Sequence, residues 1–165
     1  MAGAAIAHLA THGAYGSPRN GGASNVDTLW QSEVILAYSG DARAMHRDET
    51  DGRLYAFELM GWDLSGLDLL VLSACETGRG DEAFVGGVRG LPTAASLAGA
   101  KRALLTLWPV ADDGTADFMV RFYEHLKQGR TYAAALRDTR RDAIEGKIPT
   151  ARDPLVWAAF VLFEN

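Results

Sequence analysis

The chain has 165 residues, 16 Lys and Arg against 21 Asp and Glu, and one cysteine, so its formal net charge is −5. This length predicts a single domain with a substantial core, and a lone cysteine excludes an intramolecular disulfide or a multi-cysteine zinc site. The acidic balance argues against a general nucleic-acid binder. No apolar run approaches the roughly 18–20 residues of a membrane helix, and no basic residue precedes an apolar stretch at the start as in a signal peptide. We therefore expect a cytoplasmic protein that binds neither nucleic acid nor a membrane.

Four short apolar runs predict β-strands. Their hydrophobicity is continuous rather than alternating, which is typical of strands covered on both faces in a parallel sheet. We expect the first run to stop at Gly13. The four predicted strands cover residues 4–11, 67–74, 102–107 and 157–163.

Three helices are predicted between these strands, over residues 91–100, 115–128 and 131–145. The second has apolar residues at helical spacing, and Asp112 and Asp113 precede it as candidate caps. The order strand, helix, strand, helices, strand predicts a parallel, doubly wound α/β sheet.

Residues 14–52 are rich in Gly, Asn and Ser and interrupt this pattern. We expect them to form a long excursion from the sheet, with a hairpin and one short strand near residues 34–38. Loops of this length in a compact domain are often functional.

The two residues best suited to catalysis are His12 and Cys75. His12 follows the first predicted strand and Cys75 the second, and parallel strands bring such ends to one edge of the sheet. An imidazole beside a thiol can deprotonate it, and the thiolate attacks a carbonyl carbon. The backbone N–H groups of Gly13 and Cys75 would then face the developing oxyanion.

Each of these features also has a structural interpretation. A lone Cys at a strand end is most often inert core. For His8, on the same strand face as His12, we expect the role of a buried, hydrogen-bonded histidine. Glu76, Asp81 and Glu82 form a solvated loop or, alternatively, a pocket for a basic residue of a substrate.

Two further groups of polar residues are expected on solvated surfaces. His46 lies in a charged loop, and His125 lies on the polar side of the second predicted helix. The arginines and aspartates of the third helix have the spacing of exposed ion pairs, and Arg137, Arg140, Arg141, Asp138 and Asp142 form this set.

Four blocks of the sequence together resemble the CHAT domain, a caspase-like peptidase family found in bacteria, often beside TPR repeats. The first two contain His12 and Cys75, and the blocks occur in the order of the family. They read HLATHG at 8–13, VLSACETGRG at 71–80, GLPTAASLAGAKRALLTLWPVADDGT at 90–115 and DPLVWAAFVLFEN at 153–165.

The resemblance implies a caspase–hemoglobinase fold, a mostly parallel sheet with helices on both faces. It implies a cysteine endopeptidase that acts on a protein or peptide substrate, with His12 as general base, Cys75 as nucleophile, and no metal or cofactor. The residues around Cys75 differ from the caspase signature Q-A-C-[RQG]-G, so aspartate specificity is not carried over.

The resemblance also implies that residues 1–165 are one domain that lacks its N-terminal strands, because a CHAT domain has two strands before the HLATHG block. Their loss would expose a hydrophobic edge, which a preceding segment or another chain would cover. One rival function is a non-catalytic interaction or regulatory module that partners a TPR protein. A second is a flavodoxin-like small-molecule binder, which no phosphate-binding loop supports.

Overall fold

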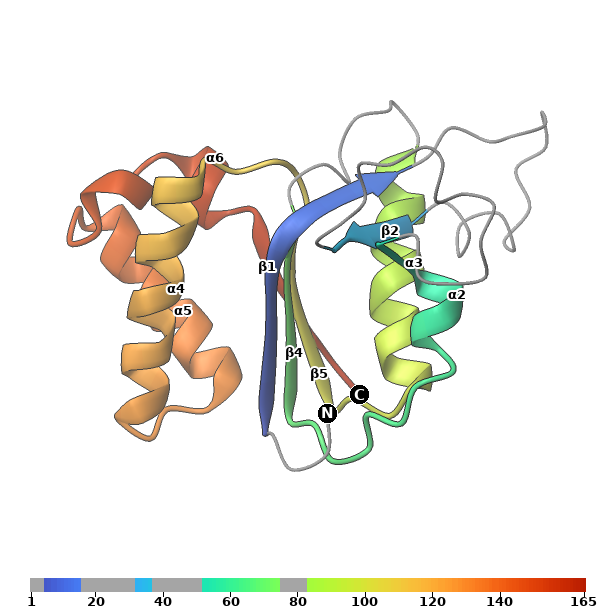
Figure 1. Cartoon of the computed structure of the whole chain (residues 1–165). Helices are drawn as coiled ribbons and strands as arrows, with labels where there is room; N and C mark the ends of the chain where they lie inside the picture. Colours follow the sequence, from blue (N-terminus) through green and yellow to red (C-terminus); the bar gives the residue numbers. More distant parts are fainter. Residues whose placement is uncertain (1–4, 16–31, 37–51, 75–82) are drawn as a thin grey trace.

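The computed structural model describes residues 5–15, 32–36, 52–74 and 83–165. In this part of the chain six strands form one sheet with the order β3-β2-β1-β4-β5-β6, and helices cover both of its faces (Figure 1). The strands are β1 (Ile6–Tyr15), β2 (Ser32–Ile35), β3 (Arg53–Tyr55), β4 (Leu69–Ala74), β5 (Arg102–Thr106) and β6 (Phe160–Glu164). The helices are α2 (Ala56–Leu59), α3 (Ala83–Leu97), α4 (Asp112–Lys127), α5 (Tyr132–Ile144) and α6 (Pro154–Trp157), with a short 3-10 helix η2 (Pro149–Ala151).

The mixed α/β class is confirmed, and the four predicted apolar runs correspond to β1, β4, β5 and β6. The central strands β1, β4 and β5 are parallel neighbours. The prediction that the last strand is also parallel is wrong, since β6 pairs with β5 in the antiparallel direction. The cause is the connection: α4 and α5 form two consecutive passes along the sheet, which return the chain to the carboxyl end of β5 before β6 begins.

Strand β1 continues past Gly13, where we expected it to stop. Residues Ile6 to Thr11 pair with β4 in parallel, whereas His12 to Tyr15 pair with β2 in the antiparallel direction. The strand curves strongly along its length (Figure 1). A glycine within a strand is typical of such bends. Gly13 therefore does not end the strand but lies where the pairing of β1 changes from β4 to β2.

The predicted excursion contains one strand, and its partner β3 begins directly after the predicted end at residue 52. Strand β2 overlaps the expected strand near residues 34–38, and β3 pairs with β2 in the antiparallel direction. Strand β3 and helix α2 were not predicted, because three and four residues are too short for a hydrophobic period to be visible. Residues 16–31 and 37–51 lie outside the described part of the chain.

The predicted helices correspond to α3, α4 and α5, with different starting points. Helix α3 begins at Ala83, although Gly86 and Gly87 lower its intrinsic propensity and Pro92 lies inside it. The cap of α4 is Ala111, so Asp112 and Asp113 lie in the first turn, where their charges complement the helix dipole.

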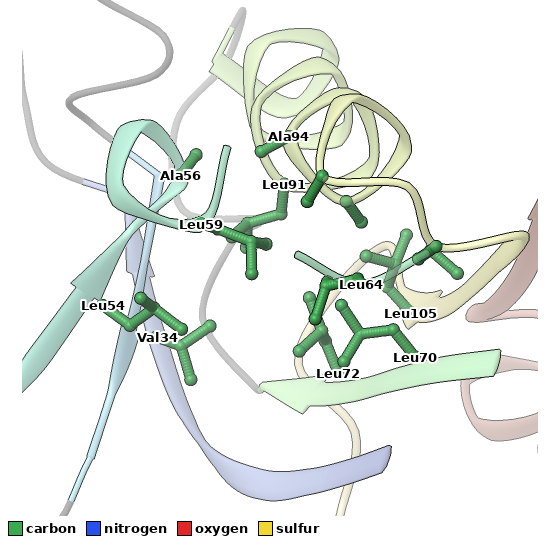
Figure 2. Packing of buried hydrophobic residues seen from close by; sticks show 14 of the residues in the cluster. Val34, Leu54, Ala56, Leu59, Leu64, Leu70, Leu72, Leu91, Ala94 and Leu105 are labelled. Carbon is green, nitrogen blue, oxygen red and sulfur yellow. The ribbon is translucent and has the colours of Figure 1, made fainter. Parts of the chain in front are cut away.

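Two hydrophobic layers hold the sheet between the helices. One lies between the sheet and α2 and α3, and Leu70, Leu72 and Leu91 are among its members (Figure 2). The other lies under α4 and α5, where the buried rings of Phe118 and Phe160 are stacked with centroids 4.2 Å apart and an interplanar angle of 8°. Alternate residues of β4 enter opposite layers, which explains its continuous apolar run.

The α4–α5 interface also contains a buried polar cluster, so the prediction of solvated faces is wrong for its members, whereas Arg137 and Arg141 are exposed as predicted. His125 and Asp142 are 8 % and 5 % exposed, and Asp138 is buried as well. Asp142 accepts hydrogen bonds from Arg121 and His125 of α4 and from Lys147. Burial alone would raise the pKa of Asp142, but the hydrogen bonds from Lys147, Arg121 and His125 outweigh it and lower the pKa to about 2.

No helix in the described ranges is long and apolar enough to cross a membrane.

Candidate active site

The parallel ladder between β1 and β4 ends where the sequence places the predicted dyad. Its last residue pair is Thr11 opposite Ala74. His12 follows Thr11 in the chain and Cys75 follows Ala74, and consecutive Cα atoms are about 3.8 Å apart. The backbone of His12 belongs to β1, whereas its side chain and Cys75 lie outside the described part.

The hairpin of β2 and β3 fixes the other side of this junction. His12 lies opposite Ile35, and Gly13 lies opposite Val34. The hydroxyl of Thr11 donates a hydrogen bond to the carbonyl oxygen of Ile35, which ties the two strands together at the last position before His12. The backbone of His12 is therefore paired with β2, directly after the last residue of β1 that is paired with β4.

The proposed substrate-pocket residues are not placed by the structure. Glu76, Asp81 and Glu82 lie outside the described ranges. The side chain of His12 and the backbone N–H of Cys75 lie outside them as well. His46 also falls outside them. The predictions for these residues remain predictions.

A cavity of about 500 Å³ opens beside the end of the parallel ladder, between β1, β4 and α4. Thr11 of β1 and Ser73 of β4 line it, next to the dyad positions in sequence. Its α4 wall is mostly apolar, with Met119 and Val120 among the lining residues. The volume lies in the range of small-molecule sites.

Three polar side chains from three elements meet in this cavity. The Nε2 atom of His8 lies 2.7 Å from the hydroxyl of Ser73, and the hydroxyl of Tyr123 lies 3.0 Å from Nδ1 of the same ring. The expectation of a hydrogen-bonded His8 is confirmed. The expectation that it is buried is wrong, because its side chain remains open to the cavity.

The electrostatics of this cluster are those of neutral groups. Partial burial of the His8 ring, which stays open to the cavity on one side, lowers its pKa below the ordinary value, and burial raises the pKa of Tyr123 to about 12. At neutral pH the ring and the phenol are both uncharged. Sequence reasoning identified His8 but missed Ser73 and Tyr123, because Tyr123 is 115 residues away in the chain. A signal for Ser73 was its position near the end of the predicted strand, two residues before Cys75 in the sequence.

A comparison with known protein families gives a match over the full length of the chain. The family model described as the CHAT domain matches residues 1–165. This match confirms the resemblance carried by the four sequence blocks. No curated protein matches the chain.

Proposed function

Because the chain belongs to the CHAT domain family, we propose that it is a cysteine endopeptidase in which His12 and Cys75 form the catalytic dyad. The observation that carries the proposal is the pairing of Thr11 with Ala74 at the end of the parallel ladder. These are the residues immediately before His12 and Cys75. Both catalytic positions therefore follow the same rung of the sheet at its carboxyl edge, where open α/β folds place their sites.

The reaction we propose proceeds through an acyl-enzyme. The Cys75 sulfur forms a bond to the peptide carbonyl carbon, while its proton moves to the imidazole of His12. His12 then returns that proton to the leaving amine as the C–N bond breaks. A water molecule attacks the resulting thioester, its proton passes through His12 to the sulfur, and the free carboxylic acid and the thiol are regenerated.

The oxyanion donors proposed for this reaction are the backbone N–H groups of Gly13 and Cys75. Gly13 lies opposite Val34 in an antiparallel ladder, and along such a ladder N–H groups alternate between the partner strand and the opposite side. The role requires the N–H of Gly13 to be directed away from β2. That direction faces the end of β4, where the parallel ladder stops at Ala74.

Alkylation of the sole cysteine tests the dyad directly. We expect iodoacetamide to label the wild-type chain at pH 6.5 faster than it labels free cysteine, because a thiolate paired with an imidazolium persists below the ordinary thiol pKa of about 8.5. The His12→Ala variant should lose this excess rate. A peptidyl acyloxymethyl ketone should label the wild type and not the Cys75→Ala variant. Equal labelling of the wild type, the His12→Ala variant and free cysteine would refute the dyad.

For the substrate we propose a basic residue next to the scissile bond, recognised by Glu76, Asp81 and Glu82. The support is their negative charge in the segment that follows Cys75. A positional peptide library tests this preference. Enrichment of Arg and Lys is expected, and a library without such enrichment would exclude the acidic pocket while leaving the dyad intact.

The rival function is a non-catalytic docking or regulatory module for a TPR-containing partner. One observation favours it: within the described residues, Ile6 to Ala10 of β1 have no strand partner on the side opposite β4. Unpaired strand edges are templates for pairing with another chain. A folded protein that is silent to both thiol probes and co-purifies with a TPR protein would favour this function over the peptidase.

A further inference from the structure

The hydrogen-bonded set of His8, Ser73 and Tyr123 connects the two strands that lead to the proposed dyad. In the parallel ladder His8 is opposite Val71, and Ser73 is opposite Ala10. The contact of 2.7 Å between His8 and Ser73 therefore runs diagonally across the two strands. It links side chains on the face covered by α4, as Tyr123 of that helix shows by its own contact with His8.

Spacing along each strand relates this set to the dyad. Residues two and four positions apart in a strand lie on one face. His8 is four residues before His12, and Ser73 is two residues before Cys75. The link therefore lies close to the last rung of the parallel ladder, Thr11 opposite Ala74, after which the two proposed catalytic positions follow in sequence.

The third member anchors this link to a helix. The hydroxyl of Tyr123 reaches Nδ1 of His8 at 3.0 Å, and the two rings are in contact with centroids 5.9 Å apart. Because a hydroxyl both donates and accepts, either neutral tautomer of His8 has both of its ring nitrogens satisfied. The contact therefore fixes the plane of the His8 ring between a strand on one side and α4 on the other.

We propose that His8, Ser73 and Tyr123 are positioning residues, which hold β1 and β4 in the relative placement that brings His12 within reach of Cys75. This inference rests on the proposed function. It assigns no contact with substrate to the three residues. Their effect is exerted through the backbone of the two strands, over the last few residues before each catalytic position.

The environment of the set is suited to this role. Besides His8 and Tyr123, the titratable side chain that lines the cavity in the described part of the chain is Asp112, at the start of α4. The remaining polar residues that line it in this part of the chain are Thr11, Ser73 and Thr115. A link of neutral groups keeps its geometry across the neutral pH range, whereas an ion pair at this position would also act on the charge of the dyad.

The experiment compares the pH profile of Cys75 alkylation in four variants of the full chain. Tyr123→Phe removes one hydroxyl and keeps the ring, and Ser73→Ala removes the other. Ser73→Thr restores a hydroxyl with a side chain that strands accept readily. Thr115→Val is the matched control, because Thr115 lines the same cavity and its buried hydroxyl has no hydrogen-bond partner among the described residues.

We expect Tyr123→Phe and Ser73→Ala to lower the alkylation rate at pH 6.5 by about ten- to a hundredfold, since a small misplacement of reacting groups has an effect of this size. Their profiles should move toward that of an ordinary thiol, with half-maximal rate near pH 8.5. Ser73→Thr and Thr115→Val should follow the wild-type profile. Thermal unfolding measured on the same samples should show that all variants remain folded at the assay temperature.

Three outcomes would overturn the inference. The first is an activated wild type whose profile is unchanged in Tyr123→Phe and Ser73→Ala. The second is a loss of rate in Ser73→Thr as large as in Ser73→Ala, which would indicate general packing rather than the hydroxyl. The third is a wild type no more reactive than free cysteine, and this result alone would also refute the proposed function.

Discussion

His125 of α4 and Asp142 of α5 form a hydrogen bond within the protein, with Nε2 of the ring 2.9 Å from Oδ2 of the carboxylate. Both residues belong to helix faces that are polar in sequence, and both are buried. Arg121 and Lys147 complete the shell of donors around the same carboxylate. Asp142 is therefore the centre of the polar contact between these two helices.

The first prediction concerns acid. The pKa of Asp142 is lowered to about 2 in the folded chain from its ordinary value of 3.8, so the ionised carboxylate stabilises the folded state above about pH 4. Allowing for solvent screening around the exposed Lys147, we expect a contribution of about 1 to 2 kcal/mol at neutral pH. It should be lost as the pH falls from about 4 toward 2. Urea unfolding at a series of pH values measures it.

The matched substitution is Asp142→Asn, which we expect to lower the free energy of unfolding by about 2 kcal/mol at pH 7 because it removes a buried acceptor of charged donors. Glu124→Gln is the control, since Glu124 binds the same Arg121 at 2.8 Å but is exposed. Its cost should stay below about 0.5 kcal/mol. If the Asp142→Asn protein lost the same unfolding free energy between about pH 4 and 2 as the wild type, that loss would not be due to Asp142.

The second prediction concerns a close approach at Gly114 in α4. A Cβ atom there would lie 2.9 Å from the carbonyl oxygen of Thr150 and 3.0 Å from a methyl group of Val156. Gly114→Ala should therefore lower the free energy of unfolding by about 1 to 3 kcal/mol through overpacking. Gly66→Ala is the control, because among the described residues no atom beyond its chain neighbours lies within 4 Å of the added carbon. Denaturant midpoints of both variants compare them, and equal midpoints would argue against a tight contact between α4 and η2.

The third prediction concerns the stacked rings of Phe118 and Phe160, which fasten α4 to β6. Phe118 is 0 % exposed, so Phe118→Ala should cost about 3 to 5 kcal/mol. Val120, two residues further along the same helix, is 59 % exposed. Val120→Ala should change the free energy of unfolding by less than about 0.5 kcal/mol. Calorimetry on both variants gives the comparison, and a small cost at Phe118 would mean that this layer can collapse around the missing ring.

The fourth prediction concerns the hairpin that pairs with His12. Glu33 of β2 is 5 % exposed and receives a hydrogen bond of 2.5 Å from Arg53 of β3. Loss of a buried charged partner costs several kcal/mol, so Glu33→Gln should increase amide exchange at Val34 and Leu54 by at least about tenfold.

Glu164→Gln is the control for the hairpin variant. Glu164 accepts from Arg102 at 2.6 Å, but it is 47 % exposed at the outer strand. Exposed pairs of this kind contribute about 0 to 1 kcal/mol, so exchange in β5 and β6 should change little. Similar effects of the two substitutions would show that burial does not decide the strength of the pair.

The central strands could be predicted from the sequence because burial on both faces leaves a continuous apolar run, as in β4 and β5. The direction of β6 could not, since it depends on two helices in succession rather than on the strand's own residues. The polar contacts between elements were also out of reach. In the sequence, His125 and Asp142 each have the position of a surface residue on their own helix, and they are buried because the two helices pack together.

The candidate site was predictable in part for the same reason. In the sequence His12 and Cys75 each follow a predicted strand, and the rule for parallel sheets places such ends at one edge. The structure shows that the parallel ladder ends at Thr11 and Ala74, and the dyad itself stays a prediction. The set that includes Ser73 and Tyr123 needed the fold, because its members come from two strands and a helix that are remote in sequence.

Because β1 pairs first with β4 and then with β2, the two proposed reacting residues belong to different parts of the sheet. His12 is the first residue paired with the hairpin, whereas Cys75 directly follows the last rung of the parallel sheet. A displacement of the hairpin would carry the backbone of His12 with it while every rung between β1 and β4 stayed in place. The stiffness of a few hydrogen bonds in β2 and β3 is thus a second mechanical quantity, beside the β1–β4 link, on which the meeting of the proposed base and nucleophile would depend.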